Sequence, residues 1–430
     1  MRLPALPTRR LRTLSRQGQI RLTFIAGGLI VGAVAVGFAM LADTMQALFA
    51  QILAVSRYAA LGVTPLGFAL SAFLARRLFP NSGGSGIPQA IAARALTDET
   101  MRHSLVSLRI AFGKVLLTAL GLLCGASIGR EGPTVQVGAS VMYAVGNISK
   151  RQQRGLILAG AAAGVAAAFN TPMAGIVFGI EEMGRSFETR TASLMIGTVI
   201  AAGVVSLAVV GNYNYFGTTS IGLHGAWAWL AVPLCGVVGG LAGGLFSRIV
   251  VMAAGPWRGV VGGWLKQRPI LLAGLCGLGV ALLGLASHDR IYGTGYQQVV
   301  HLLDGSVVPP VGFGLMKLGA TLLSAISGIP GGIFSPSLAV GAGIGRTLSA
   351  VMGGVPLPVM VVLGMVAYFS GVVQAPITAF VIVIEMTNNH ALVLPVMLAA
   401  LIGFAASRLV CHEGIYHALS RNYLPKELHH

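Results

Sequence analysis

The stretch GREGPTVQVG, residues 129–138, places a charged glutamate, Glu131, between two long apolar runs. The run KVLLTALGLLCGASI precedes it, and an apolar segment continues from Val135 to Val145. A carboxylate in hydrocarbon costs several kcal/mol unless a partner compensates it. Because proline favours the first turn of a helix, a helix should begin near Glu131 inside the membrane. Its free N–H groups and positive dipole end attract an anion, so the stretch predicts an intramembrane anion site.

The composition indicates an all-α polytopic membrane protein. Of 430 residues, 55% are hydrophobic and only 10% are charged, and the mean hydropathy is +0.80. Many apolar stretches approach or exceed the roughly 18–20 residues that cross a bilayer as a helix. Examples are residues 22–41, 229–250, 270–286 and 392–409. A membrane barrel would instead show short alternating segments.

The net charge of +17 is unevenly distributed and predicts the orientation in the membrane. Six arginines and no acids lie in residues 1–21, which places this segment in the cytoplasm by the positive-inside rule. The basic C-terminal tail, with Arg408, Arg421 and Lys426, is expected there too. We therefore expect a multi-pass protein of the cell inner membrane with both termini cytoplasmic. No soluble domain is expected, so no nucleic-acid partner is either.

Two further site types are not expected. The basic start is not a signal peptide, because its apolar segment is too long and more spans follow directly. The cysteines have no CxxC spacing, which argues against a metal site or a disulfide framework. They are Cys124, Cys235, Cys276 and Cys411.

The chain contains an internal duplication, which appears as four matches in the same order at offsets of 203 to 209 residues. One match alone would be weak, whereas four together indicate a duplicated unit of about 200 residues. The matched pairs are GREGPTVQVG (129–138) with GIFSPSLAVG (332–341), Lys114 with Lys317, PMAGIVFGIE (172–181) with PITAFVIVIE (376–385), and GSGIPQ (84–89) with GTGYQQ (293–298).

The duplication divides the chain into four segments. Residues 1–21 are the basic N-terminal segment, and residues 22–220 are the first membrane repeat, with a repeat core of 51–220 and an extra first span. Residues 221–424 are the second repeat, and residues 425–430 are the tail. If each half crosses the membrane an odd number of times, the halves must be inverted. Duplicated transporters commonly bind their substrate where the repeats meet, near the midplane.

Two more Gly/Pro stretches resemble the start at Glu131. GGIFSP, residues 331–336, has the same form, and GSGIP, residues 84–88, adds the hydroxyl of Ser85. Several half-helix N-termini aimed at one point would bind an anion without a full positive charge. Weak binding at several sites is what fast passage of an ion requires.

These three stretches, together with Tyr416, resemble the CLC family of chloride channels and proton/chloride antiporters. The resemblance covers roughly residues 20–424. It implies a CLC-like fold of two inverted repeats with many tilted and broken helices, a homodimer with one pore per subunit, chloride and protons as the transported ions, no cofactor and no enzymatic activity. Only 14 residues follow Tyr416, which is typical of the short prokaryotic type without cytoplasmic regulatory domains.

The resemblance also implies roles for individual residues. Glu131 would be the gating glutamate, whose carboxylate occupies an outer anion site when no chloride is there. Ser85 and the Tyr416 hydroxyl would contact a central chloride. The backbone N–H groups of Ile333 and Phe334 would complete that central site. Arg130 and Gly132 would flank the gate and belong to the anion-binding residues.

Each of these residues has a structural alternative. Ser85 could cap its own helix, and Tyr416 could belong to an interfacial aromatic belt. Arg130 could form an ion pair at the outer face. Lys114 and Lys317 could draw anions inward, or could pair with an acid or reach an interface.

A second acid distinguishes exchangers from channels in this family. FNTPMAGIVFGIEEM, residues 169–183, matches the region that carries the inner proton relay, and Glu182 is its second acid. The alternative is a solvated helix-end carboxylate, or one paired with Arg185. Glu181 and its repeat mate Glu385 are interpreted as structural, because both halves keep them.

The sequence leaves three rival functions. A passive chloride channel would share the fold, and a related branch could carry fluoride or nitrate, although GREGP, Ser85 and Tyr416 fit the chloride type. An intramembrane enzyme is disfavoured because the HExxH motif is absent. One departure from many exchangers is that Gln89, Ala90 and Ile91 stand where acids often follow GSGIP.

Overall fold

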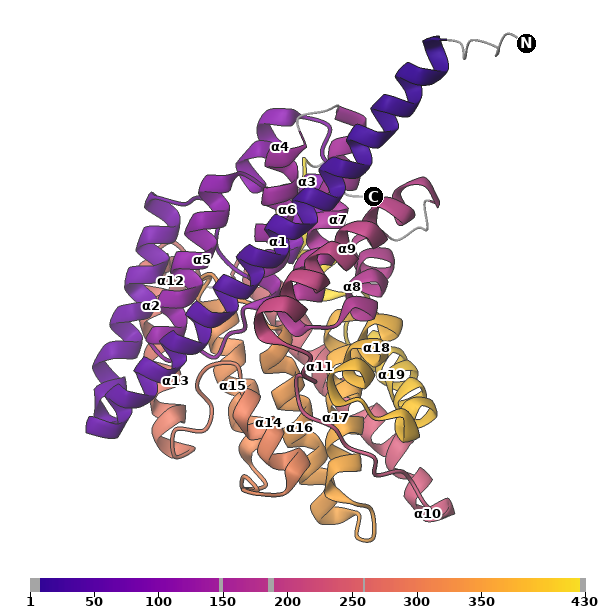
Figure 1. Ribbon diagram of the computed structural model, residues 1–430. Coiled ribbons are helices and arrows are strands. Elements are labelled where there is room, and N and C mark those ends of the chain that lie inside the picture. Colours follow the sequence, from indigo (N-terminus) through magenta and orange to yellow (C-terminus); the bar gives the residue numbers. More distant parts are fainter. Residues whose placement is uncertain (1–7, 147–149, 185–188, 258–259, 426–430) are drawn as a thin grey trace.

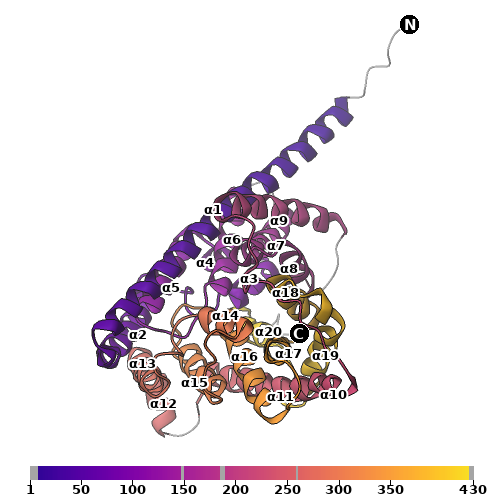
Figure 2. The same ribbon diagram turned by 60° about the horizontal axis from the view of Figure 1, so that its bottom comes forward.

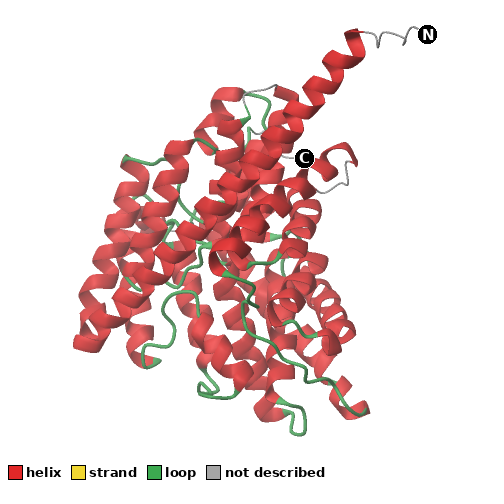
Figure 3. Ribbon diagram, viewed as in Figure 1, coloured by secondary structure: helices red, strands yellow, loops and turns green. Residues whose placement is uncertain are grey.

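The computed structural model describes residues 8–146, 150–184, 189–257 and 260–425, and these are almost entirely helical (Figure 1, Figure 3). Within those ranges the β-structure is limited to two isolated bridges, which are described below. The prediction of an all-α fold is confirmed.

The first half holds the helices up to α9. In order, they are α1 (Thr8–Val55), η1 (Arg57–Ala59), α2 (Ala60–Arg77), α3 (Ile87–Ala95), α4 (Glu99–Leu105), α5 (Leu108–Leu123), α6 (Glu131–Val145), α7 (Lys150–Phe169), α8 (Pro172–Phe178), the π-helical turn η2 (Gly179–Gly184) and α9 (Thr189–Val210).

The second half repeats this pattern of long and short helices. In order, they are α10 (Ala226–Trp229), α11 (Ala231–Ala254), α12 (Val260–Lys266), α13 (Pro269–Ala286), α14 (Tyr296–Asp304), α15 (Phe313–Ile326), α16 (Phe334–Val351), α17 (Leu357–Val373), α18 (Pro376–Thr387), η3 (His390–Leu392), α19 (Val393–Arg408), α20 (Ile415–Ser420) and η4 (Arg421–Tyr423).

Seven helical segments of the described chain are long and apolar enough to cross a membrane. Most of the others are shorter, and several begin at Gly/Pro turns in the interior, as α3, α6 and α16 do. Non-helical backbone at membrane depth is tolerated only where protein or a water-filled cavity surrounds it. The broken helices therefore mark the part of the molecule where a polar site can exist.

The packing relates the two halves. Helix α1 packs on α7 and α9, and α11 packs in the same way on α17 and α19. Helices α2 and α13, which occupy matching positions, pack directly on each other (Figure 1, Figure 2). Because α1 has the same neighbours as α11, we propose that it is the first helix of the repeat rather than an extra span.

The matching helix pairs are held by matching glycines. A Cβ on Gly138 of α6 would lie 2.3 Å from the carbonyl oxygen of Gly160 in α7. A Cβ on Gly341 of α16 would lie 2.5 Å from the carbonyl oxygen of Gly364 in α17. Small residues let membrane helices approach to backbone contact. Both halves use this device at the same place.

Two glutamates join the halves by a reciprocal exchange. The carboxylate of Glu181 accepts the N–H groups of Ile377 and Thr378 at the start of α18, at 3.1 and 2.6 Å. The carboxylate of Glu385 accepts those of Met173 and Ala174 at the start of α8, at 3.1 and 2.8 Å. Each acid thus satisfies helix donors of the other half, which is the structural role expected for this pair.

The two repeated lysines also have matching partners. Lys114 Nζ donates to the carbonyl of Gly84 at 2.9 Å, and Lys317 Nζ donates to that of Gly293 at 2.7 Å. Both ammonium groups are fully buried against the Gly-rich turn of their own half. The sequence suggested an acid or an interface as the structural partner, but these turn carbonyls take that place.

Candidate functional site

The Gly/Pro turns that precede α3, α6 and α16 are joined by backbone hydrogen bonds. Gly129 and Gly332 exchange two of them, at 2.7 and 2.8 Å, in an antiparallel bridge. Gly84 donates to the carbonyl of Ile329 at 3.1 Å and accepts the N–H of Gly331 at 3.0 Å. Three helix N-termini from two halves are therefore fixed at one point.

Glycine is required at this junction because the backbones leave no room for side chains. A Cβ on Gly132 would lie 2.4 Å from Ser85 Oγ, and one on Gly332 would lie 3.0 Å from the backbone nitrogen of Gly132. Gly86, the N-cap of α3, has a φ of 99°, which side chains with a Cβ rarely adopt. Gly132 thus brings the start of α6 directly onto Ser85.

Glu131 is the first residue of α6, and its side chain is fully buried at the junction. The hydroxyl of Ser335, on α16, donates to its Oε1 at 2.6 Å. The backbone N–H groups of Glu131 and Ser335 also face the carboxylate. Its Oε2 has no hydrogen-bond partner in the described chain. The carboxylate therefore sits where two helix N-termini converge, in the place that they prepare for an anion.

Ser85 and Tyr416 face each other a short way from Glu131. Both residues are buried, and neither hydroxyl makes a well-aligned hydrogen bond in the described part of the chain. The Tyr416 hydroxyl faces Ser85 and lies within electrostatic reach of both Glu131 and Glu182. Two buried hydroxyls without acceptors are donors available to an anion.

The alternatives for these two residues are wrong. The N-cap of α3 is Gly86, and α3 has no side-chain cap, so Ser85 does not cap its helix. Tyr416 is 1% exposed, which excludes an interfacial position. Ile333 is the N-cap of α16 and Phe334 its first residue, so their N–H groups have no acceptor within that helix.

Arg130 is engaged elsewhere. Its Nη1 lies 2.7 Å from the carboxylate of Asp43 on α1 and donates to the carbonyl of Ala39 at 2.7 Å. The guanidinium borders a cavity of about 490 Å³ that Tyr213, Tyr215 and other residues also line. This is the ion pair considered as the structural alternative, while Arg130 also lies within electrostatic reach of Glu131, so its place among the anion-binding residues stays a prediction.

Glu182 lies in the π-helical turn η2 and is 3% exposed, so it is not a solvated helix-end acid. The His417 Nε2 atom lies 3.5 Å from its Oε1 and 2.9 Å from its backbone oxygen. From α3, Arg94 donates to the carbonyl of Met183 at 2.9 Å. Arg185, the alternative partner, lies outside the described residues.

Sequence reasoning missed His417 and Ser335. His417 directly follows Tyr416, so the short helix α20 presents one side chain to Ser85 and the next to Glu182. Adjacency to Tyr416 was the available signal. Ser335 lies inside the GGIFSP motif, but its contact depends on how α6 and α16 meet, which the sequence does not display.

Gln89, which stands where many exchangers carry acids after GSGIP, contacts the turn before α3. Its side-chain amide donates to the carbonyl of Gly83 at 2.6 Å and so holds the turn that carries Ser85. The polar network at this turn therefore persists with an amide in it. Within the described residues, no group of three His, Cys, Asp or Glu side chains is arranged to hold a metal ion.

Comparison with known proteins identifies relatives over most of the chain. The chain matches the family model for voltage gated chloride channels over residues 67–408. The H(+)/Cl(-) exchange transporter ClcA of Yersinia pseudotuberculosis serotype IB (strain PB1/+) is 31% identical, over 93% of this chain and 87% of that protein. ClcA of Citrobacter koseri is 29% identical, over 95% of this chain and 89% of that protein.

Solved structures share the fold. A slow cyanobacterial Cl-/H+ antiporter is 25% identical with a TM-score of 0.79, over 95% of this chain and 99% of that one. A CLC-type fluoride/proton antiporter is 20% identical with a TM-score of 0.78, over 94% of this chain and 98% of that one.

Proposed function

The chain belongs to the family of voltage gated chloride channels, and from this premise we propose that it is a proton-coupled chloride antiporter. One observation carries the proposal. The Glu131 carboxylate lies at the convergent N-termini of α6 and α16, in a place suited to an anion, with one oxygen left without a partner. A carboxylate and a chloride ion cannot both occupy that place.

Protonation decides between the two occupants. An ionised Glu131 is itself the anion that the helix ends hold, and it blocks entry. Once protonated, it loses the charge that favours this position and can leave it. Chloride then passes between this outer position and the central one, where the hydroxyls of Ser85 and Tyr416 and the N–H groups of Ile333 and Phe334 receive it.

Exchange, rather than passive conduction, requires a proton path from the other side. Glu182 supports it, because it is a second buried acid and Tyr416 lies within electrostatic reach of both acids. The relatives named above as exchange transporters support the same assignment. We propose that Glu182 receives protons from the inner solution and that His417 holds its carboxylate in position.

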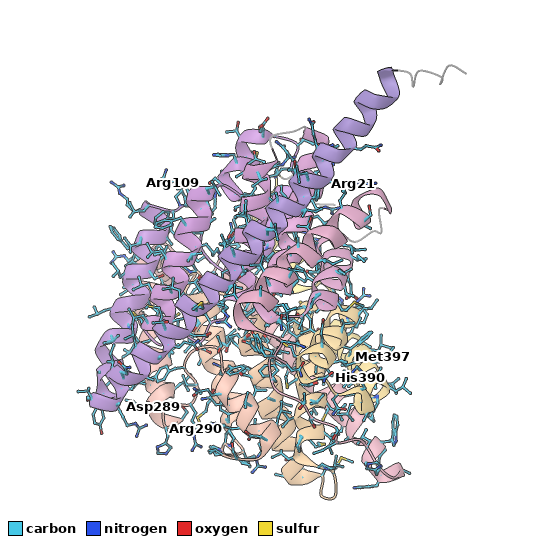
Figure 4. The ribbon with its side chains drawn as sticks, viewed as in Figure 1. Arg21, Arg109, Asp289, Arg290, His390 and Met397 are labelled. Atoms are coloured by element: carbon cyan, nitrogen blue, oxygen red, sulfur yellow. The ribbon has the colours of Figure 1, made fainter. Side chains whose placement is uncertain are left out.

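The membrane arrangement is proposed from the charges. Arg21 and Arg109 lie toward one end of the molecule, and Asp289 and Arg290 lie toward the other (Figure 4). Arg76 and Arg77 close α2 at the end where Arg109 binds the Leu78 carbonyl. We therefore assign the arginine-rich end to the cytoplasm of a cell whose inner membrane holds the protein. A homodimer follows from family resemblance, and the mass of the detergent-solubilised protein tests it.

Reconstitution into liposomes tests the function. With a chloride gradient as the only driving force, the protein should move protons against their own gradient, and its reversal potential should shift with pH. A reversal potential that follows chloride alone would assign a passive channel. Replacing chloride by fluoride or nitrate in the same assay measures the anion preference.

A further inference from the structure

We propose that the side-chain hydroxyl of Ser335 is a ligand of the outer anion position, shared in turn by the Glu131 carboxylate and by the transported anion. The outer anion position is the place that the Glu131 carboxylate occupies between the starts of α6 and α16. The inference rests on the proposed function, because it assumes that the transported ion binds at this position.

The contact itself is short and buried. Ser335 Oγ lies 2.6 Å from Glu131 Oε1, and both residues are buried. Hydrogen bonds to an ionised group are roughly twice as strong as neutral ones. The donor comes from the second half and the carboxylate from the first, so the bond spans the junction of the repeats.

The Ser335 hydroxyl has no competing task in its own helix. It is the second residue of α16, whose N-cap is Ile333, and that helix start has no side-chain cap. The matching position of the first half is Gly132, which has no side chain. The hydroxyl is therefore an addition to the repeated architecture, and it donates its hydrogen bond to the Glu131 carboxylate.

Tyr215 is a neighbour of this hydroxyl. Tyr215 is buried, borders the outer cavity, and its hydroxyl lies against the Ser335 side chain. A serine hydroxyl has one proton, and the carboxylate accepts it. With Glu131 in place, the Ser335 proton is therefore used by the carboxylate and is not available to Tyr215.

The same geometry serves either occupant. A chloride ion that replaces the departed carboxylate meets the N–H groups of two helix starts and the Ser335 proton. Arg130 with its partner Asp43, Tyr215 and Tyr416 are the other charged or titratable groups that face this region. None of them is recorded as a hydrogen-bond donor to Glu131 in the described chain, which leaves Ser335 as its side-chain donor.

Bromide and anomalous diffraction can test the ligand directly. In the Glu131→Gln variant, which removes the competing charge, bromide should appear at the outer position within hydrogen-bond distance of Ser335 Oγ, and at the central position near Ser85 and Tyr416. Adding Ser335→Ala should weaken outer binding about tenfold, the effect of one hydrogen bond to an ion. The central peak should persist. Equal outer occupancy with and without the hydroxyl would overturn the proposal.

Matched variants separate the ligand role from packing. Ser337→Ala, two residues further along α16, removes another buried hydroxyl and should leave the outer peak unchanged. Ser335→Thr keeps the hydroxyl and should retain bromide there. Gel filtration and thermal unfolding confirm that each variant is folded. Loss of the outer peak in Ser337→Ala as well would reduce Ser335 to a packing residue and overturn its assignment as a ligand.

A flux measurement supplies a second readout. With Glu131 intact, Ser335→Ala removes a donor that favours the ionised carboxylate. Protonation should then release Glu131 more easily, so the pH of half-maximal chloride flux should rise. An unchanged pH profile would contradict the shared-ligand proposal. If wild-type liposomes pump no protons while the outer bromide still depends on Ser335, the proposed function fails and this inference stands.

Discussion

The N-termini of α6 and α16 occupy matching positions in the two repeats, yet they carry different side chains. The first presents Glu131 and Gly132, and the second presents Phe334 and Ser335 at the matching positions. The same split appears elsewhere, since Glu182 is matched by Met386. Features that stabilise the fold are kept in both halves, namely the glycine contacts and the lysine–turn bonds within each half and the exchanged glutamates between them. In contrast, Glu131, Glu182 and Ser335 each occur in one half and are matched by a different residue type in the other.

The comparison teaches how to sort buried polar residues in a duplicated chain. A residue kept in both halves is expected to have a structural role, because both halves share the same fold. A residue present in one half only is expected to serve the ion pathway, because that pathway has two different ends. The predictions below test this rule, with paired variants wherever the chain offers a partner.

The largest effect is expected at Glu131. Glu131→Ala removes the carboxylate that competes with chloride, so proton movement should cease and chloride flux should become insensitive to pH. Liposome flux assays between acidic and neutral pH measure both quantities. Steep pH dependence that survives in this variant would remove Glu131 from the gate.

Substitution of Glu182 should uncouple proton movement from chloride transport without stopping the chloride flux. Glu182→Gln cannot carry a proton, so proton movement should fall by about a hundredfold while chloride flux continues. The neighbouring Glu181→Gln is the control, because Glu181 caps α18 and should affect stability while the chloride-to-proton ratio is kept. Full proton coupling in Glu182→Gln would refute the relay assignment.

Ser85 should affect selectivity more than coupling. Ser85→Pro removes a hydroxyl donor that favours a compact ion, so the preference for chloride over nitrate should fall about tenfold. Fluxes measured with each anion in turn give the ratio. An unchanged ratio would count against Ser85 as a ligand.

The smallest effects on transport are expected at the paired glycines, where stability should change instead. Gly138→Ala would place a Cβ 2.3 Å from the facing carbonyl oxygen, and Gly341→Ala would place one 2.5 Å from its own facing carbonyl oxygen. Each should destabilise the fold by about 1–3 kcal/mol, the usual cost of overpacking. Thermal unfolding in detergent compares the two. A large loss from one and none from the other would show that the halves do not share this contact.

Much of the architecture followed from repeated motifs, because a motif that recurs at one offset also predicts its counterpart. The helix starts at Glu131 and Phe334 and the structural role of Glu181 and Glu385 were reached in this way. The place of α1 in the repeat could not be predicted from a repeated motif. Its apolar sequence shares no motif with α11, and the proposal that the two helices match rests on their common packing neighbours.

The side-chain partners within the site were the hardest to predict. Asp43 lies on α1, far in sequence from Arg130, and an exposed acid near the end of a span gives no sign of its partner. The Ser335–Glu131 bond spans 204 residues and depends on the register of two helix starts. His417 had no motif of its own. Such contacts arise from tertiary packing, which local patterns do not encode.

The exchanged glutamates have a consequence for the ancestry of the chain. Glu181 binds the start of α18 while Glu385 binds the start of α8, so residue i of one half contacts residue j of the other and the reverse also holds. That reciprocity is the defining property of an isologous interface between two identical subunits. The two halves meet as an antiparallel homodimer would, and the linker between them makes permanent an association that two separate copies of one gene product could once have formed.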